Sequence, residues 1–217
     1  MIKTKNLNRS IFLDTSSIEE VKRWNATGVI DGITTNQYIM LQDGIKPSAY
    51  YATVKKICKE MRGKPVSVEI TDSTLSKEKM VHEAKKLNAI AENIVIKVPM
   101  IPETTKSLEV INELTHANIS VNVTTMMTFE QLAVAILAAS RSRKISFVSL
   151  FWGRSMEDYT KYSSRSDFMA NHPKVGIASQ VNSNPQNIVR AAATFIKEGG
   201  YENIKIIAGS IRTAAMV

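Results

Sequence analysis

A lysine interrupts one of the most apolar stretches of the chain. In ENIVIKVPM, residues 92–100, Lys97 follows three β-branched residues and precedes Val98. Burying a charged, unpaired amine costs several kcal/mol, but burial also lowers the pKa of a lysine and frees its amine as a nucleophile. A free amine that faces a carbonyl forms a Schiff base, whose protonated nitrogen draws electrons from the neighbouring C–C bond. Lys97 is therefore expected to be buried because it reacts.

Two carboxylates stand in similar surroundings. Glu69 lies in the apolar run PVSVEI, residues 65–70, and Asp14 ends SIFLD, residues 10–14. Carboxylates in such positions move protons while a carbinolamine forms and while an imine is hydrolysed. Each also has a structural alternative, because Glu69 and Lys97 can form a buried salt bridge with each other and Asp14 can cap the following helix.

These residues belong to a series of alternating strand-like and helical patterns. Strands are predicted at 10–14, 29–35, 65–70, 93–98, 119–123, 145–151 and 204–211. Helices are predicted near 16–26, 47–62, 76–91, 103–116, 128–140 and 186–199. This alternation predicts parallel strands covered by helices, and Val- and Ile-rich strands are typical of sheets buried on both faces. Seven units in a single domain, residues 1–217, favour an α/β fold of the (β/α)8 TIM barrel type over an open sheet.

Helix start signals occur at Ser16 or Ser17, at Thr128 and at Asn184. The segment 153–185 is polar and long for a loop, with room for one short helix, and is interpreted as a lid or an oligomer contact. The chain ends in SIRTAAMV, where the helix before an eighth strand should begin. We therefore expect the eighth strand to be absent and the chain to be truncated at its C-terminus.

Each predicted strand has a reactive or hydrogen-bonding residue at or near its carboxyl end. These residues are Asp14, Thr34 with Asn36, Glu69, Lys97, Asn122 with Thr124, Ser149, and Ser210 with Arg212. In a (β/α)8 barrel these ends meet at one mouth, where the chemistry takes place. Any one of these residues could instead cap a helix or form a turn. All seven predicted strands carry such a residue, however, and this indicates a shared site. Arg154 and Arg212 lie just beyond strand ends, where guanidinium groups can hold a phosphate, and solvated surface arginines are the alternative.

Composition limits the other classes of function. The single cysteine, Cys58, falls in a helical core pattern, so the sequence indicates no disulfide, no cysteine cluster for zinc and a reducing cytoplasm. His82, His116 and His172 have no metal-ligand spacing. No apolar run is long enough to span a membrane. The net charge of +8 is scattered in short basic pairs, which favours solvated helix faces over nucleic-acid binding and can attract phosphorylated small molecules.

These residues together resemble the transaldolase family, within the group that includes fructose-6-phosphate aldolase. The matching segments are FLDTSSIEEVKR, GVIDGITTN, VSVEI, NIVIKVPM, ISVNVTT, VSLFWGR and IIAGSIR. They follow in order along almost the whole chain, apart from residues 155–185. The resemblance implies a class I aldolase barrel with no metal and no cofactor, which acts on phosphorylated sugars and is expected to form homo-oligomers.

The resemblance also implies roles by position. Lys97 would carry the Schiff base, Asp14 would assist proton transfer, and Glu69 with Thr124 would hold and activate water. The remaining residues would bind substrate: Thr34, Asn36, Asn122 and Ser149 would line the pocket for the dihydroxyacetone unit, and Arg154, Ser210 and Arg212 would bind the phosphate. The implied donors are sedoheptulose 7-phosphate and fructose 6-phosphate.

Two positions separate the branches of this group. The aldolase branch typically has Gln in place of Glu69 and Tyr in place of Phe151, so this chain is identified with the transfer branch. A lyase that releases free dihydroxyacetone and a catalytically silent sugar-phosphate-binding barrel stay open as alternatives. Gln37 and Tyr38 replace the usual proline turn, and Met126 with Met127 replaces another usual run. Either departure from the family pattern marks a different acceptor substrate. For the two methionines, ordinary packing in the apolar core is the alternative explanation.

Overall fold

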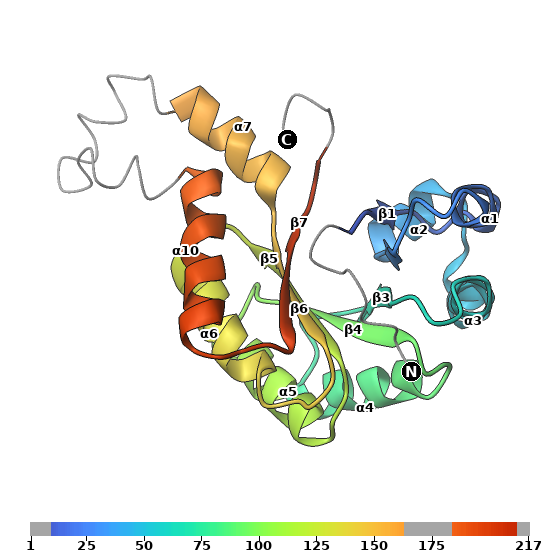
Figure 1. Ribbon diagram of the computed structural model, residues 1–217. Coiled ribbons are helices and arrows are strands. Elements are labelled where there is room, and N and C mark those ends of the chain that lie inside the picture. The colour runs from blue at the N-terminus through green and yellow to red at the C-terminus, as the bar shows by residue number, and fades with distance from the viewer. Residues whose placement is uncertain (1–9, 163–183, 212–217) are drawn as a thin grey trace.

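The computed structural model describes residues 10–162 and 184–211 and contains one parallel seven-stranded sheet. The strands pair in the order of the sequence, from β1 to β7. Their bounds are β1 Phe12–Asp14, β2 Gly32–Thr34, β3 Val66–Glu69, β4 Ile94–Pro99, β5 Val121–Met126, β6 Ser146–Leu150 and β7 Ile204–Ala208. The sheet curls with helices along its outer side (Figure 1). The predicted α/β fold is confirmed: it is a TIM-type barrel with seven strands in the described residues, open between β1 and β7.

The helices lie where the sequence predicts them, with one addition. Their bounds are α1 Ile18–Ala26, α2 Gln37–Gln42, the 3-10 turn η2 Pro47–Ala49, α3 Tyr50–Glu60, α4 Lys77–Asn88, α5 Thr104–His116, α6 Phe129–Ala139, α7 Trp152–Tyr162 and α10 Pro185–Glu198. Ser17, Thr128 and Asn184 accept hydrogen bonds from the backbone as N-caps, which confirms the predicted starts. Helix α2 was not expected.

Helix α7 covers the beginning of the segment predicted to be a long loop with room for one short helix. Residues 163–183 lie outside the described part of the chain. The interpretation of this segment as a lid or an oligomer contact therefore stays a prediction. None of the described helices is both long and apolar enough to cross a membrane.

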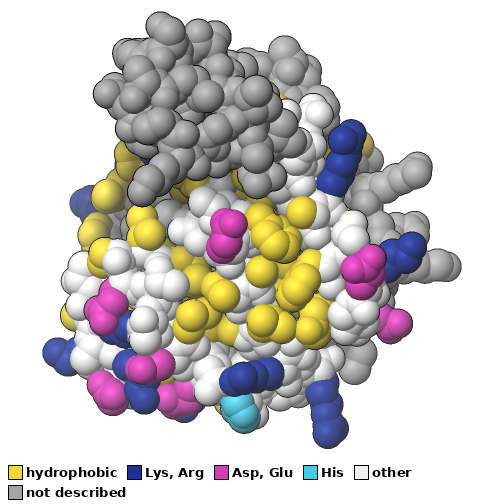
Figure 2. Space-filling view, turned by 90° about the vertical axis from the view of Figure 1, so that its left-hand side faces the viewer, with side chains coloured by type: hydrophobic (Ala, Val, Ile, Leu, Met, Phe, Trp, Pro, Cys, Tyr) yellow, Lys and Arg dark blue, Asp and Glu magenta, His cyan; other side chains and the backbone are white. Residues whose placement is uncertain are grey.

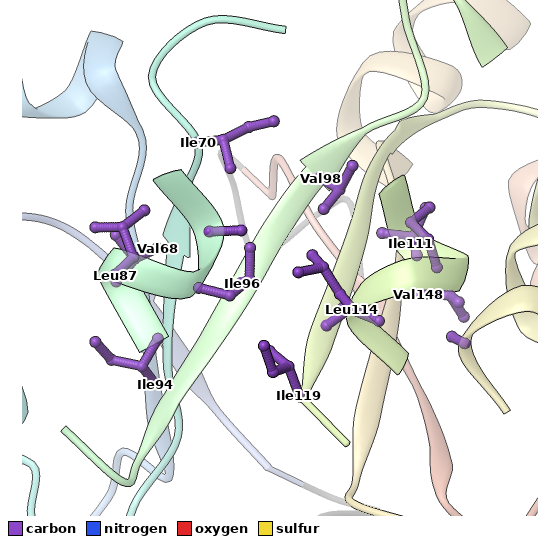
Figure 3. Close-up of a cluster of buried hydrophobic side chains, with 14 of the residues drawn as sticks. Val68, Ile70, Leu87, Ile94, Ile96, Val98, Ile111, Leu114, Ile119 and Val148 are labelled. Carbon is purple, nitrogen blue, oxygen red and sulfur yellow. The ribbon is translucent and has the colours of Figure 1, made fainter. Parts of the chain in front are cut away.

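The core lies between the sheet and its helices, and it explains where Lys97 points. Ile96 and Val98 of β4 lie beside Leu114 of α5 in the cluster of buried apolar side chains (Figure 3). Because successive side chains of a strand point to opposite faces, Lys97 between them points into the barrel. The strand is buried along its whole length. Alternate side chains of β4 therefore pack against the helices, and the side chains between them point into the barrel.

Cys58 lies in the same core, as predicted. Burial raises the pKa of its thiol to about 12, so the thiolate is scarce at neutral pH. On the side of the molecule where α10 lies, apolar side chains gather over the centre of the surface (Figure 2). Val134 and Leu137 of α6 are exposed. The homo-oligomer that the sequence suggests stays a prediction.

Candidate active site

A cavity of about 520 Å3 opens at the carboxyl ends of the strands and gathers most of the predicted site. Eleven of the twelve predicted site residues line it: Asp14, Thr34, Asn36, Glu69, Lys97, Asn122, Thr124, Ser149, Phe151, Arg154 and Ser210. The twelfth, Arg212, lies outside the described residues. Residues from all seven strand ends thus share one cavity, as expected where parallel strands converge.

Lys97 lies at the buried floor of this cavity. Its residue surface is only 6% exposed, and its Nζ donates a hydrogen bond of 3.1 Å to the backbone oxygen of Thr35. The same Nζ lies 3.3 Å from Oε2 of Glu69, because the register of β3 and β4 sets the two residues side by side. The salt bridge that is the structural alternative therefore exists. Both partners also line the cavity, so the pair is accessible to a substrate.

Glu69 has a perturbed acidity that suits proton transfer. Burial raises the pKa of its carboxyl group, and the Asp14 carboxylate raises it further, whereas the charge and the hydrogen bond of Lys97 lower it. Burial dominates because a carboxylate loses its hydration when it leaves water. Glu69 therefore keeps its proton to higher pH than an exposed glutamate, and a group that exchanges a proton closer to neutral pH is a better general acid or base.

Four other polar side chains of the cavity form hydrogen-bonded pairs. The Thr34 hydroxyl donates to Oδ1 of Asp14 at 2.8 Å. Ser149 donates to Oδ1 of Asn122 at 2.7 Å, and Nδ2 of Asn122 donates to the hydroxyl of Ser67 at 3.1 Å. Sequence reasoning missed Ser67, although its place two residues before Glu69 on β3 assigns it to the same inward face. The buried Asn122 and Ser149 are thus preorganised, which lowers the cost of ordering them around a ligand.

Comparison with known proteins shows the family of the chain. Residues 11–217 match the family described as transaldolase/fructose-6-phosphate aldolase. The chain belongs to this family. It is 32% identical over 206 residues to a probable transaldolase of Streptococcus equi subsp. zooepidemicus, which covers 95% of this chain and 78% of that relative. Probable transaldolases of Methanococcus maripaludis and Methanococcus vannielii are 40% identical over 143 residues, or 66% of this chain. The chain spans 60% of the length of these methanogen relatives.

Two residues of this family member fix the end of β3, where Glu69 stands. Nε2 of Gln37 donates to the backbone oxygen of Glu69 at 3.1 Å and also to that of Ile70. The buried Tyr50 hydroxyl donates to the same oxygen of Glu69. Burial raises the pKa of Tyr50, so its hydroxyl stays protonated and remains a donor. The departure from the usual proline turn at Gln37 thus supplies a side-chain donor that proline lacks.

The rim of the cavity contains strained backbone. Thr125 and Ser210 have φ of 63° and 62°, in the left-handed region that a β-branched threonine rarely adopts. Thr125 lies where the register of β5 with β6 shifts between Val123 and Met126, and it lines the cavity with Thr124. Sequence reasoning did not single it out. Bulges and strain of this kind concentrate at functional sites, where they re-aim side chains.

The residues of the two departures from the family pattern lie in different surroundings. Met126 is fully buried in the apolar core, and neither Met126 nor Met127 lines the cavity. The ordinary packing alternative therefore holds for Met126. Tyr38, in contrast, lines the cavity, which the sequence did not predict. Within the described residues, no group of three His, Cys, Asp or Glu side chains is arranged to hold a metal ion.

Proposed function

We propose that this protein is a transaldolase that moves a dihydroxyacetone unit from a ketose phosphate to an aldose phosphate. Sedoheptulose 7-phosphate and fructose 6-phosphate are the proposed donors. The observation that carries the proposal is a buried lysine amine at the floor of a cavity, 3.3 Å from a carboxyl group whose pKa is raised. We place the reaction in the cytoplasm, because the only cysteine is a buried free thiol.

The first half of the reaction joins the donor to Lys97. The lone pair of Nζ attacks the keto carbon and the carbonyl π bond breaks. The nitrogen then gives up one proton and the oxygen takes one up, which gives a neutral carbinolamine. Loss of this hydroxyl as water leaves a protonated imine between the former keto carbon and Nζ. Glu69 donates the proton to the departing hydroxyl, since its raised pKa keeps that proton available. Thr124, which also lines the cavity, holds the water that later hydrolyses the imine.

Cleavage and transfer follow from this imine. Asp14 accepts the proton of the hydroxyl on the carbon two positions from the imine carbon. The bond that joins this carbon to the neighbour of the imine carbon breaks, and its electron pair moves into an enamine on Lys97. The released aldose leaves as an aldehyde. An incoming aldose phosphate then presents its carbonyl to the enamine carbon, and the reverse steps form the new C–C bond. Water attacks the imine carbon and returns the free amine with the new ketose phosphate.

The remaining cavity residues bind the two ends of the sugar. Asn122 and Ser149 hydrogen-bond the hydroxyls of the dihydroxyacetone unit, with Thr34 and Asn36 closing the pocket beside them. Arg154 and Ser210 hold the phosphate at the rim, with Arg212 beyond the described residues. Phe151 lines the cavity without a hydroxyl group. A phenyl ring cannot relay the proton needed to release free dihydroxyacetone, and this supports transfer over the lyase reaction.

Borohydride trapping tests the proposal. The protein is incubated with fructose 6-phosphate, reduced and digested, and the adduct is located by mass spectrometry. We expect the added mass on the peptide that contains Lys97, and loss of the adduct and of turnover in Lys97→Met. Lys85→Met is the matched control, because Lys85 also pairs with a glutamate, Glu113, but on the exposed surface of helices α4 and α5.

The same experiment separates the alternatives. Turnover of fructose 6-phosphate should require an acceptor such as erythrose 4-phosphate. Cleavage at the same rate without an acceptor would support the lyase instead. Absence of any adduct in the unmodified protein would support a silent sugar-phosphate-binding barrel and would refute the proposal.

A further inference from the structure

We propose that Tyr38, held by Gln42, binds the aldose part of the sugar and determines which aldehydes the enzyme accepts. The inference rests on the proposed function and adds specificity-determining residues to it. Both residues belong to α2, the short helix that replaces the proline turn. Neither carries chemistry at the reacting carbon.

The place of Tyr38 suits a contact with the distal end of a substrate. Asn36, Tyr38, Ile39 and Gln42 line the same cavity as Lys97. Lys97 is 6% exposed, whereas Tyr38 is 67% exposed. The cavity therefore extends from the buried amine to α2 at its open rim. A sugar joined to Lys97 through its keto carbon extends its aldose part away from the floor and toward this rim.

The hydrogen bonding of Tyr38 leaves it a donor for a ligand. Nε2 of Gln42 donates to the Tyr38 hydroxyl oxygen at 2.7 Å, one helical turn along α2. In the described part of the chain, the structure gives no acceptor for the phenolic proton. A phenol that already accepts a hydrogen bond is a well-oriented donor to a sugar hydroxyl or a phosphate oxygen.

Helix α2 is anchored at both ends, so this rim is rigid. At its start, Gln37 donates to the backbone oxygens of Glu69 and Ile70 at the end of β3. At its end, Oδ2 of Asp43 accepts from the backbone nitrogen and the hydroxyl of Ser16 at 2.8 and 2.7 Å. The helix thus bridges the strand end that carries Glu69 and the loop that follows Asp14. A side chain held at a fixed distance from the reacting groups can discriminate between substrates of different length.

A contact between copies of the chain is the main alternative. Leu41, on the same helix, is 63% exposed and is not among the residues that line the cavity. An oligomer contact would use Leu41 together with Tyr38, whereas a substrate contact would use Tyr38 and Gln42. The two explanations therefore predict different effects for Leu41→Ala.

The test separates the aldose end from the imine end of the substrate. Free dihydroxyacetone forms an imine at Lys97 but has no aldose part, so its borohydride trapping should be unchanged in Tyr38→Phe and Tyr38→Ala. Loss of one hydrogen bond should raise the KM for erythrose 4-phosphate roughly two- to tenfold in Tyr38→Phe, and more in Tyr38→Ala, with little change in kcat. Tyr51→Phe is the matched control, because Tyr51 is 44% exposed and lies outside the cavity lining.

Each outcome decides one of the two proposals. If the unmodified protein traps no dihydroxyacetone, the proposed function fails, whatever Tyr38 does. If trapping occurs but the KM is unchanged in both Tyr38 variants, the role of Tyr38 is refuted and the proposed function stands. An altered oligomeric state in Tyr38→Ala and in Leu41→Ala, with unchanged KM, would likewise refute it. Reduced trapping of dihydroxyacetone would place the effect at the imine or on the fold, and would also overturn the inference.

Discussion

Replacing Lys97 by methionine should destabilise the folded chain by an amount that grows with pH. In the native protein, the Lys97 amine lowers the pKa of the Glu69 carboxyl by charge and hydrogen bonding, while burial raises it. Methionine removes both of the lowering effects and keeps the volume of the side chain. The pKa of Glu69 in the folded state should therefore rise further, and the unfolded state should stay near the ordinary value of about 4.3.

The sign of the effect follows from proton binding. A carboxyl group whose pKa is raised by folding contributes stability that is fully present below the unfolded pKa and is lost as pH rises through the folded pKa. The variant should thus lose little stability near about pH 4 and most near about pH 8. Breaking a fully buried pair costs about 3–5 kcal/mol. The side chain of Glu69 is 19% exposed, so we expect a smaller difference, about 2 kcal/mol, between the two pH values.

Urea unfolding at a series of pH values measures this difference. Lys97→Met combined with Glu69→Gln should remove the growth with pH, because glutamine does not ionise. Lys85→Met serves as the control, since the Lys85–Glu113 pair is 49% and 43% exposed and should contribute less than about 1 kcal/mol at any pH. An equal loss of stability at both pH values in Lys97→Met would refute the account of how Glu69 is tuned.

Three further predictions concern the supports of the site and the core. Gln37→Ala should lower the free energy of unfolding by about 1–2 kcal/mol and shift the pH profile of kcat, since Glu69 loses a support; an unchanged profile would leave Gln37 a purely structural role. Asn93→Ala should cost about 2–3 kcal/mol in urea unfolding, because its buried amide donates to three backbone carbonyls; a loss below about 0.5 kcal/mol would contradict this. Cys58 should react with iodoacetamide only after unfolding, since burial raises its pKa to about 12; rapid alkylation of the native chain would refute it.

The success of the sequence-based fold prediction has a local cause. Strand β4 was recognisable because Ile94, Val95, Ile96 and Val98 favour a buried strand. Helix α6 was recognisable from the start signal at Thr128, which in the structure forms a capping box with Gln131. Helix α2 was missed for the opposite reason. With six residues it is too short to be stable by itself, and it depends on contacts of Gln37 and Asp43 with segments far away in the sequence.

The candidate site divides in the same way. The sequence by itself determined which residue types stand at the strand ends, and hence that a buried lysine and several polar groups face one mouth. Only the tertiary structure decided that Lys97 pairs with Glu69 and that Gln37 and Tyr50 donate hydrogen bonds to the backbone oxygen of Glu69. It also decided that Tyr38 stands at the rim of the cavity. The physical reason is the separation of the interacting residues along the sequence. Hydrophobic periodicity and helix capping involve residues only a few positions apart. Strand register and side-chain hydrogen bonds instead join groups tens of residues apart, and they form only when the strands have paired and brought those groups together.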